Sequence, residues 1–106
     1  MRKPLPAASM HIVLALLDGE QHGYALMRRV EELSDGHVRM GAGTLYGTLN
    51  RLLDDGLIVE TRHDEDERRR YYELTGEGRT VAQGEVARLR SLVHKVSRHL
   101  PGIAPA

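Results

Sequence analysis

The chain of 106 residues is long enough for one domain, and its 41% share of hydrophobic residues is ordinary for a folded protein. It contains no cysteine, which excludes a disulfide framework and thiolate metal sites, and it has no run of about 18 apolar residues that could span a membrane. Fifteen basic residues balance fifteen acidic ones, so a nucleic-acid partner would have to be attracted by locally concentrated charge rather than by net charge.

The first predicted element is a helix that begins at Ser9, as its N-cap, and ends near Leu17. No small-residue cleavage site follows it, so we interpret it as part of the folded domain rather than as a secretory signal, and we expect a cytoplasmic protein. Its apolar residues lie on all sides, which predicts burial on all sides. Because so small a domain is expected to cover only one side, we predict that a second subunit covers the rest by contacting Ile12, Val13 and Leu16.

Two more helices are predicted next. The second begins after His22 and Gly23, ends at residues 34–36, and has an apolar face at helical spacing formed by Leu26, Val30 and Leu33. The third begins after Gly41 and is closed by Gly56, which stands at the usual position just past a helix end. Its buried face is predicted to consist of Leu45, Leu49 and Leu52.

A β-hairpin and a closing helix complete the predicted fold. Residues 57–62 and 68–74 are β-rich and flank a charged turn, which indicates a hairpin. Thr75 is a suitable N-cap for a last helix that continues to about Leu100, where Pro101 and Gly102 interrupt it. Three helices, a two-stranded hairpin and a long helix, in that order, predict a mostly α winged helix-turn-helix fold with a small β-hairpin wing.

The third helix of such a fold is the one that enters the major groove of DNA. Asn50 could pair with adenine, Arg51 could bind guanine or a phosphate, and Gly47 removes bulk where the backbone would approach DNA. The alternative is that these small and polar residues are only solvated. Their place on this helix favours DNA contact, and we predict it for Thr44, Tyr46, Gly47, Thr48, Asn50 and Arg51.

The wing offers a second set of predicted DNA contacts. Arg68, Arg69 and Arg70 cluster where the second strand begins, and Arg62 is expected to face them across the hairpin. We predict that at least one of the three contacts phosphate. The acidic residues at positions 64–67 would repel DNA, so they are expected to turn outward. The alternative is a solvated hairpin whose charges compensate one another.

The start of the second helix is a third candidate contact region. Backbone N–H groups at a helix N-terminus attract phosphate, and His22 and Tyr24 stand at that position. Both residues are predicted to contact the DNA backbone. Packing of Tyr24 beneath the first helix is an equally open interpretation.

The last helix is predicted to form a homodimer. Its apolar residues alternate in steps of four and three, the spacing of a coiled-coil seam. A two-fold dimer would place two recognition helices about 34 Å apart on near-palindromic double-stranded DNA. We therefore divide the chain into a DNA-binding domain at residues 1–75, a dimerisation helix at 76–100 and a flexible tail at 101–106. The seam comprises Ala82, Val86, Leu89, Val93, Val96 and Leu100.

Four motifs in order give the sequence a resemblance to the PadR family of transcriptional regulators. They are HGY at residues 22–24, GTLY at 43–46, RLLDDGLI at 51–58 and YYELTGEG at 71–78. The resemblance covers residues 10–79 and implies a homodimer, usually a repressor, that a small molecule or another signal releases from its operator. Gly47 departs from the family, which commonly has proline there. The single closing helix resembles that of the compact branch of the family.

The resemblance leaves the nature of any inducer open. The chain has no tryptophan or phenylalanine and no tyrosine after Tyr72, so an aromatic ligand site on the last helix is not expected. An aliphatic pocket and the absence of a small-molecule inducer both remain possible interpretations.

Other classes of function are less well supported. No convergent set of reactive groups indicates an enzyme, and no cofactor motif is present. Six histidines raise the alternative of a metal sensor, but His94 and His99 are five residues apart and do not share a helix face well. The main alternative to DNA binding is a winged-helix module for protein–protein interaction, which the neutral net charge would suit.

Overall fold

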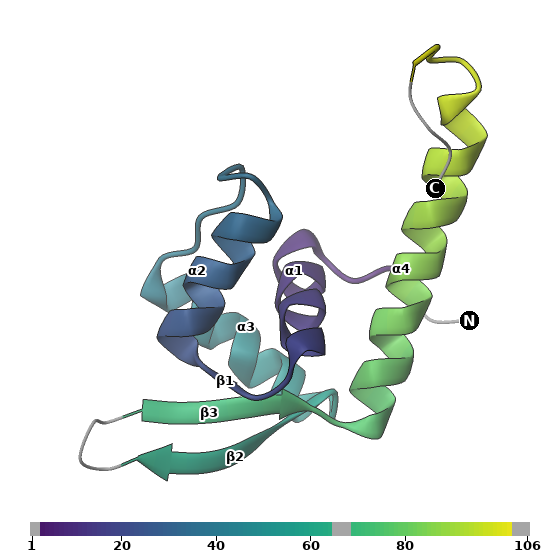
Figure 1. Cartoon of the computed structure of the whole chain (residues 1–106). Helices are drawn as coiled ribbons and strands as arrows, with labels where there is room; N and C mark the ends of the chain where they lie inside the picture. Colours follow the sequence, from purple (N-terminus) through teal and green to yellow (C-terminus); the bar gives the residue numbers. More distant parts are fainter. Residues whose placement is uncertain (1–2, 65–68, 103–106) are drawn as a thin grey trace.

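The computed structural model describes residues 3–64 and 69–102, and in them it has the predicted winged helix-turn-helix arrangement (Figure 1). Residues 65–68, which include most of the predicted acidic tip and Arg68, lie outside the described residues, as do residues 103–106 of the predicted tail. The elements are α1 (Ala7–Ala15), η1 (Leu16–Asp18), β1 (Gln21–His22), α2 (Gly23–Leu33), α3 (Ala42–Asp54), β2 (Ile58–Asp64), β3 (Arg69–Leu74) and α4 (Gly76–Ser97).

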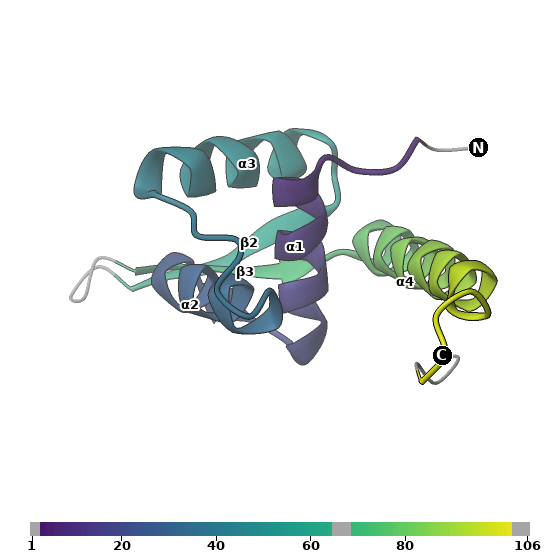
Figure 2. The same cartoon turned by 90° about the horizontal axis from the view of Figure 1, so that it is seen from above.

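Helix α1 lies at the centre of the molecule and packs against α2, α3 and α4 (Figure 2). Its N-cap is Pro6, and Ser9 is buried inside the helix, so the prediction of Ser9 as the cap was wrong. The prediction that Ile12, Val13 and Leu16 contact a second subunit is also corrected. All three are at most 1% exposed within the single chain, because neighbouring helices of the same domain cover them.

Local backbone signals end α2 and α3 where the sequence predicts. Asp35 and Gly36 adopt positive φ after α2, and Gly56 does so after α3. In both cases the N–H groups of the following turn donate hydrogen bonds to carbonyls of the last helical turn. These carbonyls would otherwise have no hydrogen-bond partner within the helix. One predicted core residue differs: Leu33 is 44% exposed because it belongs to the last, outward-facing turn of α2.

Within residues 3–64 and 69–102, the sheet has three antiparallel strands in the order β1-β3-β2. The two-residue strand β1 was not predicted, because so short a segment carries no alternation and is defined only by its pairing with Tyr71 and Tyr72 of β3. In β2 the register shifts between Glu60 and Arg62, so Thr61 is an extra residue that bends the strand.

Helix α4 packs on the body with its N-terminal part, and its contacts extend as far as Arg88, whose guanidinium reaches the Met10 sulfur of α1. Thr75 caps it as predicted: its Oγ1 accepts a hydrogen bond from the Gly78 N–H at 3.0 Å and donates one to the Gly56 carbonyl at 2.7 Å. Ala82 is fully buried against the body of its own chain, so the prediction that it contacts a second subunit is corrected. Farther along, α4 projects away from the domain (Figure 1) and ends at Ser97, three residues before the predicted end. The apolar residues of this part and of the turn after it are 40–52% exposed, namely Leu92, Val93, Val96 and Leu100.

Candidate DNA-binding surface

Helix α3 presents an outward face of small, polar and basic residues. Its inward face is formed by Leu45, Leu49 and Leu52, which are buried as predicted. Turning these leucines inward leaves the other side of the helix in solvent, and no acidic residue lies between Gly41 and Leu53. The contacts of this face with DNA stay predictions. Its exposed members are Thr44, Tyr46, Gly47, Asn50 and Arg51.

Thr48 does not belong to this face. It is only 8% exposed, and its hydroxyl donates a hydrogen bond of 2.7 Å to the carbonyl of Thr44, one turn earlier. A buried hydroxyl that bonds to its own helix has no free donor to offer a base edge. The prediction of a DNA contact from Thr48 is therefore corrected.

Tyr46 joins α3 to the start of α2. A Cβ atom on Gly23 would lie 2.8 Å from the Tyr46 hydroxyl oxygen, so the Tyr46 side chain packs directly on Gly23 and would have to move to accommodate a larger residue. At the same point the ring nitrogen Nδ1 of His22 accepts a hydrogen bond of 3.2 Å from the Ala25 N–H and caps α2. Tyr24 is 67% exposed, so packing beneath α1 is not its role in this structure.

Predicted contact residues from four elements, β1, α2, α3 and β3, meet around one hollow of about 280 Å³. Arg69 and Arg70 of β3 are exposed beside it. The Arg70 side chain lies beside the hydroxyl of Tyr72. Burial raises the pKa of Tyr72, with a further contribution from Glu60, and the charge of Arg70 opposes the rise without cancelling it. The lining residues are His22, Gly23, Tyr24, Tyr46, Arg69 and Arg70.

Arg62 does not join the wing arginines. Its partner across the hairpin is Tyr71, and its guanidinium carbon lies 3.9 Å from the centre of that ring. Its Nε bonds to a carboxylate oxygen of Glu20 at 3.2 Å. No local pattern in the sequence predicts the Glu20–Arg62 pair or the contact of Arg62 with Tyr71, because the ion pair joins residues 42 positions apart.

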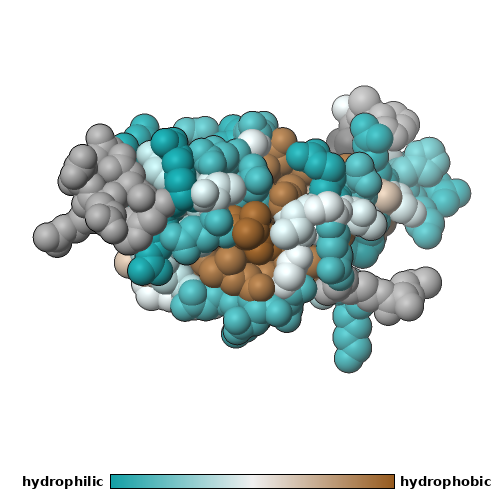
Figure 3. All heavy atoms as spheres, turned by 90° about the horizontal axis from the view of Figure 1, so that it is seen from below, coloured by the Kyte–Doolittle hydropathy of each residue, from teal (hydrophilic) through white to brown (hydrophobic). Residues whose placement is uncertain are grey.

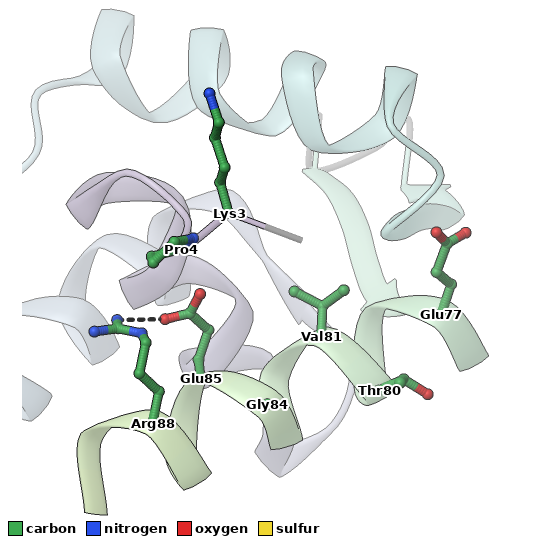
Figure 4. A pocket seen from close by; sticks show the side chains of 8 residues that line it. All are labelled: Lys3, Pro4, Glu77, Thr80, Val81, Gly84, Glu85 and Arg88. Atoms are coloured by element: carbon green, nitrogen blue, oxygen red, sulfur yellow. Dashed lines mark hydrogen bonds and ion pairs between the residues drawn. The ribbon is translucent and has the colours of Figure 1, made fainter. Parts of the chain in front are cut away.

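A second hollow, of about 510 Å³, lies between the N-terminal segment and α4 (Figure 4). Val81 and Glu85 point from α4 toward the side where Lys3 and Pro4 lie. Glu85 is only 5% exposed, accepts the Leu5 N–H at 2.9 Å and pairs with Arg88 at 2.7 Å. Burial alone would raise the pKa of Glu85, but these hydrogen bonds and the charge of Arg88 outweigh it, so the pKa lies below its usual range.

The described residues contain no group of three or more histidine and acidic side chains placed to hold a metal ion. In the same part of the chain, no helix is both long and apolar enough to cross a membrane.

A family model described as "Transcriptional regulator PadR-like family" matches residues 13–84, a span that includes α2, α3 and the wing. The chain belongs to this family. The transcriptional regulator Rv3488 of Mycobacterium tuberculosis is 38% identical to this PadR-like chain over 91 residues, which cover 85% of the chain and 82% of that protein. An uncharacterized 37.1 kDa protein in transposon TN4556 of Streptomyces fradiae is 38% identical over 89 residues, or 84% of the chain, but this chain spans only 25% of that protein.

Solved structures show the same fold. A PadR family transcription regulator from Clostridium difficile R20291 superposes with a TM-score of 0.77 at 26% identity, covering 90% of this chain and 99% of that one. RosR from H. salinarum gives a TM-score of 0.74 at 26% identity, covering 86% of this chain and 79% of its own. This PadR-like chain is therefore a DNA-binding transcriptional regulator and not an enzyme.

Proposed function

We propose that the protein is a homodimeric repressor that binds a near-palindromic operator with α3 in the major groove and releases it in response to a signal. The observation that carries this proposal is the exposed face of α3, free of acidic side chains from Gly41 to Leu53, beside a hollow where basic residues converge. Since the chain as a whole is neutral, this local arrangement supplies the attraction that net charge does not.

Each part of the surface has its own role in the proposal. Asn50 and Arg51 contact base edges, because amide and guanidinium groups can pair with adenine and guanine in the major groove. Arg69 and Arg70 contact phosphates and fix the orientation of the protein without discriminating sequence. His22 and Tyr24, at the N-terminus of α2, contact the phosphate backbone beside the same hollow.

The dimer forms through α4. Leu92, Val93 and Val96 project on the part of the helix that leaves the body, and so large an apolar surface on a small protein favours a partner. A hollow of about 440 Å³ offers a place for it, lined chiefly by Leu17 of η1 and by Val86 and Ala87 of α4. Seen from below, the molecule has an apolar area between the wing and α4 (Figure 3). The second subunit is thus expected on the α4 side, away from α3.

Repression, release by a small molecule or another signal, and action in the cytoplasm come from the family resemblance and are part of the same proposal. Helix α4 offers no aromatic cage for an inducer, because it contains no aromatic ring other than the imidazole of His94.

The test begins with selecting bound fragments from the source genome with the purified protein. Affinity for the selected fragment is then compared with affinity for random DNA at two salt concentrations. We expect nanomolar binding to a short inverted repeat, favoured over random DNA by roughly a thousandfold or more. No enrichment at low salt would contradict the proposal and would favour the protein–protein interaction module that the neutral charge also suits.

Arginine variants separate the assigned roles. Arg51→Ala is expected to reduce the preference for the operator, at a cost of about 1–3 kcal/mol for the specific site. Arg69→Ala is expected to weaken specific and random binding alike and to lower the slope of log K against log salt by about 0.9. Arg79→Ala is the matched control, since it removes one exposed positive charge from α4. Equal effects from all three would contradict the site assignment.

A further inference from the structure

The wing is tied to the body by a row of side chains across the three strands. His22 of β1 and Arg62 of β2 both stand opposite Tyr71 of β3. The His22 ring meets the Tyr71 ring edge-on, with centroids 5.5 Å apart, and Arg62 lies over that ring at 3.9 Å. Glu20, just before β1, closes the row by pairing with Arg62 at 3.2 Å.

The strand bend at Thr61 is what brings Arg62 to this place. The extra residue moves Arg62 from the register of an unbroken strand to the position opposite Tyr71. The guanidinium then has a ring against its face and a carboxylate at its Nε. A planar guanidinium can make both contacts at once, which a lysine ammonium cannot reproduce.

Glu20 is an unexpected residue so close to a surface that binds DNA. A carboxylate next to phosphates repels them, and it also pairs with an arginine that could otherwise bind phosphate. A negative charge at this position therefore costs affinity unless its pairing with Arg62 brings a larger gain.

We propose that Glu20 and Arg62 are positioning residues, which hold the wing at the angle that lets Arg69 and Arg70 reach phosphates while α3 lies in the major groove. This inference rests on the proposed DNA binding. Arg62 itself contacts no phosphate: it acts through the wing, and Glu20 acts through Arg62.

The direction in which one substitution changes operator affinity tests the proposal. Glu20→Gln removes a negative charge, so electrostatics alone predicts tighter DNA binding. If Glu20 positions the wing, operator affinity instead falls, by about fivefold, as expected for the loss of a partly exposed ion pair. Asp18→Asn is the matched control, because it removes the same charge two residues away and breaks a pair with Arg29 at 2.9 Å that does not involve the wing. Its operator affinity should be unchanged or slightly tighter.

Two further variants identify the route. Arg62→Lys keeps the charge that a phosphate contact needs but loses the planar group, and we expect the same fivefold loss as for Glu20→Gln. In a background of Arg69→Ala with Arg70→Ala, Glu20→Gln should have no further effect, because the contacts it positions are already gone. If Glu20→Gln lowered operator affinity further in that background, Glu20 would not act through Arg69 and Arg70, and the proposal would be overturned.

A measurement without DNA separates this inference from the proposed function. In Glu20→Gln, amide hydrogen exchange should become faster in β2 and β3 and stay unchanged in α1 and α3. Tighter operator binding or unchanged exchange in the wing would overturn the positioning role, even where the wild type binds DNA well. A wild type that binds no DNA would instead contradict the proposed function.

Discussion

At the scale of single residues, two glycines of α4 differ in whether the packing around them leaves room for a side chain. A Cβ on Gly78 would meet the carbonyl oxygen of Leu57 well inside contact distance, because the first turn of α4 lies directly on the chain entering β2. A Cβ on Gly84 would meet nothing within 4 Å. The first glycine is required by close packing, whereas the second only lowers the stability of the helix.

These two positions give a matched prediction. Gly78→Ala should lower the free energy of unfolding by about 2–4 kcal/mol, since backbone must shift to accommodate the methyl group. Gly84→Ala should raise it by up to about 1 kcal/mol, the difference in helix propensity. Thermal or urea unfolding of both variants provides the measurement. A destabilised Gly84→Ala, or a Gly78→Ala as stable as the wild type, would contradict the packing described.

Gly47 should separate stability from DNA binding. It lies on the exposed face of α3, and a Cβ there would meet nothing within 4 Å in the protein. Gly47→Ala is therefore expected to stabilise the fold by about 0.5–1 kcal/mol. If the backbone approaches DNA closely at this point, the same change should weaken operator binding about tenfold. Unfolding curves and binding titrations on one preparation check both, and unchanged affinity would place the closest approach elsewhere.

At the scale of elements, the sequence predicts what short-range chemistry decides. Thr75 as a cap and Gly56 as a helix end follow from a few neighbouring residues, and the structure confirms both. Ser9 failed as a cap because Pro6 begins the helix earlier. Strand β1 and the Glu20–Arg62 pair depend on β3 and β2, which are distant in sequence, so no local pattern contains them.

The functional face was predicted in the same uneven way. A helical wheel separates the leucines of α3 from Asn50 and Arg51, and the structure agrees on exposure. The helical wheel cannot show that the hydroxyl of Thr48, at the edge of this face, donates a hydrogen bond to the Thr44 carbonyl of the same helix. Likewise, an apolar helix such as α1 can be surrounded by its own domain or by a second subunit, and only the packing distinguishes the two.

The stability that the Glu85 carboxylate contributes by joining α4 to the N-terminal segment should depend on pH. The pKa of Glu85 is lower in the folded chain than in the unfolded one, so its contribution to stability is fully present above the unfolded pKa and is lost as the pH falls through the folded value. We expect the melting temperature of the wild type to fall more steeply in acid than that of Glu85→Gln, whose amide can still accept the Leu5 N–H. Parallel pH profiles for the two proteins would contradict this.

At the scale of the whole molecule, the projecting part of α4 is the proposed dimer interface. Val93 and Val96 are more than a third exposed and take no part in the core of the single chain. Val93→Glu with Val96→Glu is thus expected to leave the domain folded while abolishing the dimer, because buried carboxylates in a subunit interface are strongly unfavourable. Operator affinity should fall at least a hundredfold, since half-sites then bind independently.

Sedimentation and circular dichroism test this prediction together. Arg98→Glu, at the exposed C-cap of α4 and outside the apolar stripe, is the control for added negative charge. A double variant that still sediments as a dimer would exclude the distal stripe as the interface. An unfolded variant would show that these valines stabilise the chain itself, against the exposure observed.

The absence of a linker between the wing and α4 has a mechanical consequence. Strand β3 ends at Leu74 and α4 begins at Gly76, with only Thr75 between them. A helix of 22 residues is a stiff lever about 33 Å long. A tilt of about 5° at its base therefore moves its far end by roughly 3 Å. In the proposed dimer, small angular changes at Thr75 would thus become larger changes in the distance between the two recognition helices.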